Sequence, residues 1–201
     1  MDEFDTGWDL EKIHDTVILL REYWDHRSPQ IPFYTLGKAA YLDGNTDAYF
    51  EGVKTVNPIL KDYLGFMYDD LKDMLSAILR EPVGTLPSVA LPGFHVFPSD
   101  PVFLGMWGNW HVDIPHQTLS LGNQEPWAFT VAITLPTGGA GQDRRIDNKE
   151  VYLEYEPGKM YLTNGETVHR ITSYKEYVPN EYRVTLQGHL IRVDGSLIMF
   201  W

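Results

Sequence analysis

Apolar residues recur with helical spacing in two stretches near the start of the chain. From Ile13 to Trp24 they follow one another at steps of four, three and four, which is the spacing of one face of an α-helix. A second stripe runs over residues 58–80, where Pro58 suits the first turn of a helix. The pattern therefore predicts two amphipathic helices, over residues 8–26 and 58–80, each with one buried face.

The pattern changes after residue 85. Short runs of β-branched and aromatic residues alternate with Gly, Pro and Asn, which is typical of an antiparallel sandwich or small barrel. The runs cover residues 93–97, 128–135, 151–155, 159–162, 168–173 and 182–193. Helices followed by strands predict an α+β protein, in which the helices of residues 1–85 support a β core of residues 86–201. The length of 201 residues predicts one domain over residues 1–201.

One long polar segment, residues 137–149, lies between the predicted strands. It contains three glycines, which permit backbone conformations that other residues avoid. We expect a mobile loop here, and long loops at the mouth of a sandwich often act as lids. Arg144 and Arg145 lie in this segment and could hold an anionic substrate, although paired arginines on a solvated loop commonly have no such role.

The charge and cysteine content exclude several classes of function. The chain has 28 acidic and 16 basic residues and a net charge of -12, with no cluster of Lys and Arg for a nucleic acid or an anionic membrane. It has no cysteine, which excludes disulfides, thiolate zinc sites and a cysteine nucleophile. Because neither a secretory signal nor a membrane-spanning apolar run is visible, we expect a cytoplasmic protein. The oligomeric state is not indicated.

Three residues form a potential metal site. His111 and Asp113 are separated by one residue, so in a strand they would project from the same face. His169 follows 56 residues after Asp113. Two imidazoles and one carboxylate on one face of a metal are the donor set typical of non-haem Fe(II) oxygenases. A His-X-Asp pair alone often arises by chance, and Asp113 could instead begin the turn before Pro115.

A further pair of residues indicates a carboxylate site. In the strand predicted over residues 182–193, Arg183, Thr185, Gln187 and His189 share one face, and apolar residues occupy the other. An inward arginine needs an anionic partner, and guanidinium binds a carboxylate through two parallel hydrogen bonds. The arginine and the threonine hydroxyl two positions later therefore predict a carboxylate clamp. An internal ion pair with a protein Asp or Glu is the alternative.

These residues together resemble the Fe(II)/2-oxoglutarate-dependent dioxygenase superfamily, whose members share a double-stranded β-helix (jelly-roll) core. The resemblance covers roughly residues 93–201. It implies that His111, Asp113 and His169 are catalytic and hold Fe(II), and that Arg183 and Thr185 bind the co-substrate 2-oxoglutarate. The implied reaction consumes O2, releases succinate and CO2, and oxidises a C–H bond, by default to an alcohol. Desaturation, epoxidation and cyclisation use the same residues and stay open.

The sequence says less about the substrate. Residues near the predicted ligands are candidate pocket walls: Trp107, Asn109, Trp110, His116, Gln117, Trp127 and Tyr161, with Arg144 and Arg145 as candidate anion ligands. We expect a small-molecule substrate such as an amino acid derivative or a natural-product intermediate. Two other functions stay open. One is a cupin-like metalloenzyme whose Arg183 binds the substrate directly, and the other is a non-enzymatic jelly-roll module that binds a ligand.

Overall fold

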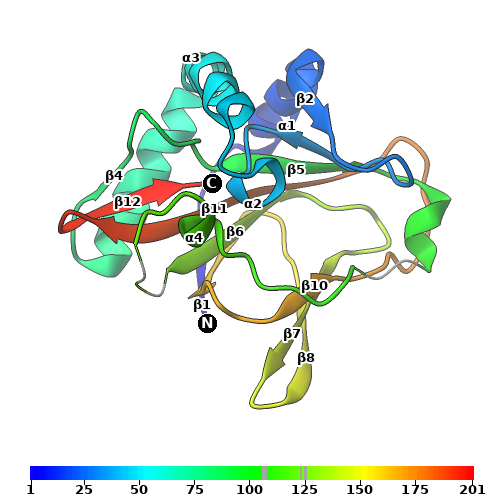
Figure 1. Ribbon diagram of the computed structural model, residues 1–201. Coiled ribbons are helices and arrows are strands. Elements are labelled where there is room, and N and C mark those ends of the chain that lie inside the picture. Colours follow the sequence, from blue (N-terminus) through cyan, green and yellow to red (C-terminus); the bar gives the residue numbers. More distant parts are fainter. Residues whose placement is uncertain (106–107, 123, 125) are drawn as a thin grey trace.

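A large antiparallel sheet forms the centre of the molecule in the computed structural model, which describes residues 1–105, 108–122, 124 and 126–201 (Figure 1). Its main strand order is β1-β9-β6-β11-β5-β3-β2. These strands are β1 (Asp2–Asp5), β2 (Trp24–His26), β3 (Tyr34–Leu36), β5 (Gly93–Pro98), β6 (Trp127–Thr134), β9 (Lys159–Asn164) and β11 (Tyr182–Val193). β12 (Ser196–Phe200) pairs with β11 and, in parallel, with β4 (Val83–Gly84).

A second, smaller antiparallel sheet has the strand order β10-β7-β8. It contains β7 (Gly141–Ile146), β8 (Lys149–Glu154) and β10 (His169–Ile171). In Figure 1 this sheet lies on the side of the large sheet that faces away from the two longest helices. Side chains of β7 and β11 line common cavities between the sheets, so the interior of the sandwich is open enough to hold ligands.

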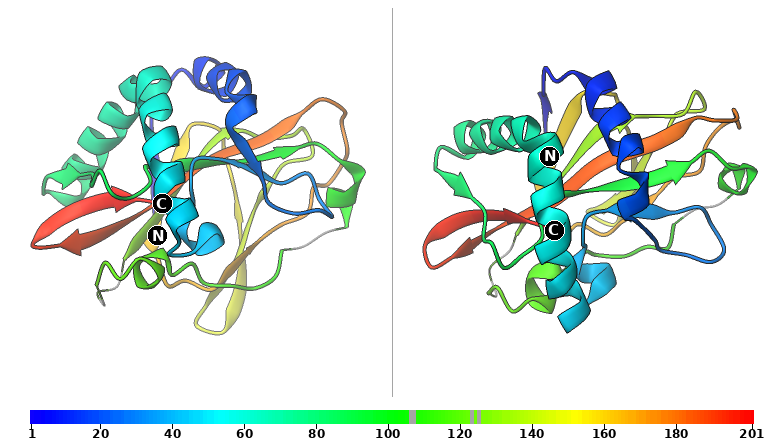
Figure 2. Two further views of the ribbon diagram at one scale, coloured as in Figure 1. Left: turned by 45° about the horizontal axis from the view of Figure 1, so that its top comes forward. Right: turned by 90° about the horizontal axis from the view of Figure 1, so that it is seen from above.

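The helices cover the other face of the large sheet. α1 (Leu10–Leu19) and α3 (Asp47–Leu79) are long, whereas α2 (Ala40–Asp43), α4 (Pro115–Thr118) and the 3-10 turns η1 (Arg21–Tyr23) and η2 (Pro101–Leu104) are short. Apolar side chains of α1 and α3 form one buried cluster with those of the sheet, and Figure 2 shows α3 crossing above the strands. The expected α+β architecture with supporting helices is therefore confirmed. No helix in the described residues is long and apolar enough to span a bilayer.

Both predicted helices have different limits in the structure. α3 begins eleven residues before Pro58, at Asp47, where the hydroxyl of Thr46 accepts a hydrogen bond from the Tyr49 amide (3.1 Å). Pro58 lies inside the helix and deprives it of one amide donor, and α3 bends along its length in Figure 2. The first predicted helix ends at Leu19, and the final residues of its range form β2 instead.

The expected mobile loop over residues 137–149 was wrong. Most of this segment is strand β7, which pairs with β8 and β10. Asp147 and Asn148 form the tight turn between β7 and β8 with positive φ angles of 50° and 60°, the conformation of the two-residue turns that suit a twisted hairpin. Arg144 and Arg145 consequently lie on a strand, with their side chains on opposite faces.

Candidate metal centre and adjoining cavities

The structure brings His111, Asp113 and His169 together. One potential ligand atom from each lies within 4.8 Å of the other two. His169 Nε2 is 3.4 Å from Asp113 Oδ2, and His111 Nε2 is 3.8 Å from Asp113 Oδ1. The two histidines form an isolated antiparallel β-bridge, in which each amide donates to the other's carbonyl at 3.0 and 2.9 Å. This bridge, and not a continuous strand around His111, places the two distant segments side by side.

The backbone fixes the tautomer of both histidines. His111 Nδ1 lies 2.7 Å from the carbonyl of Asn109, and His169 Nδ1 lies 2.8 Å from the carbonyl of Thr167. Because a carbonyl can only accept a hydrogen bond, each Nδ1 carries the hydrogen and donates it. In the neutral ring, Nε2 then keeps its lone pair and faces Asp113, as a metal ligand requires.

Asp113 supplies the negative charge of the site. Burial by itself would raise the pKa of its carboxyl, but the polar contacts with the imidazoles, that of His169 first, lower that pKa to about 2. The group is therefore a carboxylate at neutral pH. Two neutral imidazoles and one carboxylate fit a ferrous ion and leave coordination positions for other ligands.

A cavity of about 240 Å³ adjoins the three residues. Phe33, Phe97 and Ile171 form part of its apolar wall, and Arg183 and Gln142 bring polar groups to it. The combination of an apolar wall with a few polar groups is typical of a small-ligand pocket. The cavity therefore joins the candidate metal centre to the residue predicted to bind a carboxylate.

Arg183 is buried in this cavity without an anionic partner. Its residue is 1% exposed, its Nε makes no hydrogen bond, and one terminal nitrogen donates weakly to the Gly141 carbonyl at 3.4 Å. Its guanidinium carbon lies 5.5 Å from the ring centroids of both Phe97 and Tyr155. No carboxylate of the described residues lies within ion-pair distance of this guanidinium. The alternative of an internal ion pair with a protein Asp or Glu therefore has no acceptor among the described residues. Because a buried cation without a partner is costly, Arg183 is suited to bind an anion from outside the chain.

Two hydroxyl groups accompany Arg183. Tyr155 lines the same cavity, and its buried hydroxyl has no hydrogen-bond partner; sequence reasoning missed it, although it ends a predicted strand. Thr185 is fully buried with an unpaired hydroxyl, but it is not among the residues that line the cavity. Of these two residues, Tyr155 is the one that lines the cavity, and the role of Thr185 as a co-substrate ligand stays a prediction.

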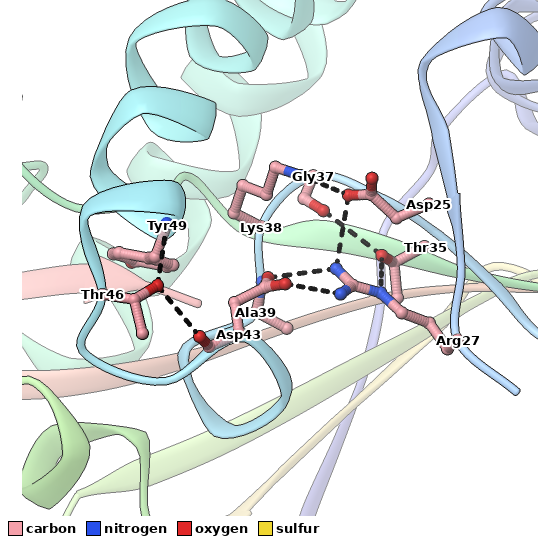
Figure 3. A network of polar contacts seen from close by, with 9 residues as sticks. All are labelled: Asp25, Arg27, Thr35, Gly37, Lys38, Ala39, Asp43, Thr46 and Tyr49. Carbon is pink, nitrogen blue, oxygen red and sulfur yellow. Dashed lines mark hydrogen bonds and ion pairs between the residues drawn. The ribbon is translucent and has the colours of Figure 1, made fainter.

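The opposite wall of the cavity comes from α2, whose position depends on a polar network (Figure 3). Tyr41 on α2 places its hydroxyl 2.6 Å from His95 Nε2, and burial lowers the pKa of His95 to about 3, so this imidazole is neutral. Arg27 donates to both carboxylate oxygens of Asp43, at 2.5 and 3.0 Å, and to Thr35 at 2.7 Å. These contacts attach α2 to β2 and β3. The sequence offered no signal for them.

A second chamber of about 30 Å³ lies on another side of the centre. It shares Asp113 and His169 with the larger cavity, and Arg144 and His189 are part of its own wall. Arg144 is 5% exposed and His189 is 3% exposed. Burial lowers the pKa of His189 to about 4, so the ring is neutral. Arg144, a candidate anion ligand from the supposed loop, and His189, which had no predicted role, therefore both line this chamber.

The residues that flank the metal ligands have different positions from those expected. None of Asn109, Trp110, His116, Gln117 and Arg145 lines either cavity. Trp110 is half-buried between Arg145 and Arg170, whose guanidinium carbons lie 4.2 and 4.3 Å from its ring centroid. Asn109 and Gln117 are exposed, and His116 is buried on α4. Trp107 lies outside the described residues.

Trp127 and Tyr161 line neither of these two cavities. Trp127 packs against the main apolar cluster. Tyr161 is 1% exposed, and its hydroxyl accepts a hydrogen bond from the Glu156 amide (2.9 Å). Both aromatic side chains therefore contribute to the packing of the fold, and their role as substrate residues stays a prediction.

Comparison with known proteins shows a similarity in fold alone. No protein-family model matches the chain, and no curated protein matches it in sequence. Among solved structures, an N-substituted L-amino acid dioxygenase from Burkholderia ambifaria AMMD in complex with α-ketoglutarate is 15% identical, with a TM-score of 0.50 over 76% of this chain and 68% of that one. The non-haem α-ketoglutarate-dependent epimerase SnoN from nogalamycin biosynthesis is 9% identical, with a TM-score of 0.50 over 94% of this chain and 77% of that one. The chain thus has the double-stranded β-helix fold of the Fe(II)/2-oxoglutarate dioxygenases, with a His-Asp-His group that could hold a metal ion.

Proposed function

We propose that this protein is an Fe(II)- and 2-oxoglutarate-dependent dioxygenase that hydroxylates a C–H bond of a small molecule. The observation that carries the proposal is the larger cavity, which is lined both by the His-Asp-His group and by the buried, unpartnered Arg183. A metal ion and a dicarboxylate co-substrate held side by side would need these two features in one cavity.

Each of these residues has a distinct role in the proposed reaction. His111 and His169 bind iron through Nε2, and Asp113 binds it through its carboxylate. Arg183 binds the distal carboxylate of 2-oxoglutarate, and Tyr155 offers a second donor beside it. Bound iron and 2-oxoglutarate together supply the oxidising power, at the expense of O2 and with release of succinate and CO2.

The apolar part of the cavity limits the access of water, and the size of the cavity limits the size of the substrate. Phe97 lies against Arg183 and limits the access of water, which strengthens the attraction between guanidinium and carboxylate. The cavity of about 240 Å³ is small, which supports a small-molecule substrate. An amino acid derivative is one such class, supported by the dioxygenase of similar fold that acts on N-substituted L-amino acids. Since SnoN is an epimerase, the outcome of the oxidation needs its own test.

Anaerobic titration with Fe(II) and 2-oxoglutarate tests the proposal. The wild-type protein is expected to develop a weak visible charge-transfer band that His111→Ala abolishes. Arg183→Met is expected to weaken 2-oxoglutarate binding at least about tenfold, because a charge-assisted hydrogen bond is lost. Arg192→Gln, which alters a surface ion pair with Glu81, serves as the control and should bind as the wild type does. Absence of the band at saturating concentrations would contradict the proposal.

Succinate and metal analysis separate the two alternatives. A cupin-like enzyme would turn over its substrate without forming succinate. A binding module would retain almost no metal after purification without oxygen, and its ligand affinity would survive chelation. The proposal requires stoichiometric metal binding and succinate formation that depends on His111, Asp113 and His169.

A further inference from the structure

The small chamber beside the candidate metal centre has room for one compact polar group. Its volume is about 30 Å³, and a single water needs roughly 10–15 Å³ on the same measure. It therefore accommodates about two water molecules, or the two oxygens of one carboxylate. A five-carbon dicarboxylate such as 2-oxoglutarate is too large for it, whereas the cavity that contains Arg183 is about eight times larger.

Arg144 brings a positive charge to this chamber. It lies opposite His169 in the β7–β10 register, and its Nε donates to Gln142 Oε1 at 2.7 Å. One terminal nitrogen lies 2.9 Å from the sulfur of Met1, which is only a weak acceptor. No carboxylate within the described part of the chain pairs with Arg144. The Tyr155 hydroxyl also interacts electrostatically with this guanidinium. Since a guanidinium has five N–H donors, Arg144 still keeps hydrogen-bonding capacity that these neutral contacts do not use.

His189 is a second unused polar group in the wall. It is 97% buried on β11, and neither of its ring nitrogens has a hydrogen-bond partner. Burying a polar group without a partner is unfavourable. A hydrogen-bond partner from outside the chain would remove this cost for the His189 imidazole. A neutral imidazole offers one N–H donor, which complements the guanidinium of Arg144 around a small anion.

We propose that this chamber binds a carboxylate of the organic substrate through Arg144 and His189. The inference rests on the proposed function, because the chamber adjoins the same Asp113 and His169 that would hold the iron. The protein then has two adjoining anion sites, Arg183 for the keto acid and Arg144 for the substrate, whose walls share Gln142 and Gln187. The substrate class is a small carboxylic acid that is oxidised at a carbon close to its carboxylate.

The anion site can be tested with formate, the smallest carboxylate. The protein is loaded with Zn(II), which accepts the same nitrogen and oxygen ligands, and with saturating 2-oxoglutarate to fill the Arg183 site. Formate is expected to shift the Arg144 Nε–Hε signal in a saturable manner at millimolar concentrations. Line broadening of ¹³C-formate then measures affinity in variants: Arg144→Gln is expected to lose at least tenfold, and Arg144→Lys to lose less.

Arg145→Gln is the matched control, because Arg145 is the next residue on β7 but points to the exposed face. It should bind formate as the wild type does. The proposal is overturned if wild-type protein shows no saturable shift, if Arg144→Gln binds formate normally, or if Arg144→Gln weakens 2-oxoglutarate binding as much as Arg183→Met does. If the wild-type protein binds formate but does not bind 2-oxoglutarate, the proposed function alone is overturned.

A turnover screen tests the substrate class directly. Succinate formation is measured against a library in which each small carboxylic acid is paired with its primary amide. Compounds that stimulate turnover are expected to be acids, and Arg144→Gln should raise their KM at least tenfold without changing the KM for 2-oxoglutarate. An amide that stimulates turnover as well as its acid would overturn the assignment.

Discussion

At the scale of the residue, the orientation of both histidines in the candidate centre depends on hydrogen bonds to backbone carbonyls. His111 and His169 each donate from Nδ1 to a backbone carbonyl two residues earlier in the chain. The local backbone therefore holds both Nε2 lone pairs toward Asp113 before any ion arrives. Such pre-orientation reduces the cost of forming a metal site.

The buried histidines make the stability of the metal-free protein depend on pH. The pKa of His189 is about 4 in the folded protein and 6.5 ordinarily. Below pH 6.5 the unfolded chain binds a proton that the folded chain excludes, so the free energy of unfolding falls as the pH falls from 6.5 to 4. The full loss is about 3 kcal/mol. Urea unfolding of His189→Gln at several pH values should show a smaller slope across this range.

His26→Gln provides the control for this measurement because His26 is exposed. It should retain the pH slope of the wild-type protein. Equal slopes in His189→Gln and the wild type would show that His189 is charged or solvated in the folded state. His95, which is also buried with a pKa lowered to about 3, contributes in the same direction and explains any slope that His189→Gln retains.

At the scale of the element, α2 illustrates how a short helix is held as a cavity wall. It has only four residues, too few for independent stability. The Asp43 carboxylate accepts from Arg27 and from the amide of Ala39 at the start of α2. Arg27 and Asp43 side chains are 11% and 16% exposed, so solvent screens this ion pair only weakly.

Removing the Asp43 carboxylate is expected to destabilise the protein. Asp43→Ala leaves the largely buried Arg27 without its main partner and should lower the free energy of unfolding by about 2–4 kcal/mol. Urea denaturation measures this change. Asp69→Ala, which removes an exposed ion pair with Lys72 on α3, should change the stability by less than about 0.5 kcal/mol. Equal effects of the two substitutions would mean that the α2 network does not stabilise the fold.

At the scale of the whole molecule, Trp201 connects parts of the chain that are far apart in sequence. It is fully buried, its ring packs over Gly93 on β5, and its carbonyl accepts a hydrogen bond from Tyr49 on α3 (3.3 Å). Its amide donates to Ala90. The last residue of the described chain thus joins the long helix to the large sheet.

Gly93→Ala is expected to disrupt this connection. A Cβ atom at Gly93 would lie 2.1 Å from two carbons of the Trp201 ring and 2.8 Å from the carbonyl oxygen of Leu36. The forced displacement should destabilise the protein by about 3 kcal/mol. Thermal or urea unfolding measures the change.

The matched control is Gly65→Ala in α3, where an added Cβ meets no atom within 4 Å. This substitution should stabilise the protein by about 0.5–1 kcal/mol, because alanine favours a helix more than glycine does. A destabilisation at Gly65 similar to that at Gly93 would indicate that any methyl group is harmful, and would remove the argument for packing against Trp201.

Local patterns in the sequence were sufficient to predict many of the helices and strands. Both long helices and the strands β5, β6, β9 and β11 were predicted near their observed positions, since periodic burial of apolar side chains is a local property. The short strands β1, β2 and β3 were missed because three or four residues carry too little periodicity. The start of α3 was misplaced because Pro58 reads as a first-turn residue, whereas Thr46 forms the actual N-cap.

The sequence by itself determined which residues could form a metal site: His111, Asp113, His169 and the inward-facing Arg183 follow from residue type and spacing. Only the tertiary structure decided which of their neighbours share the cavities. Tyr155 and Tyr41 enter the larger cavity and Arg144 and His189 the smaller one, while Trp127 and Tyr161 pack in the core. The physical reason is that alternation along a strand fixes which side chains share a face, but the pairing of distant segments, such as the bridge between His111 and His169, decides what that face meets.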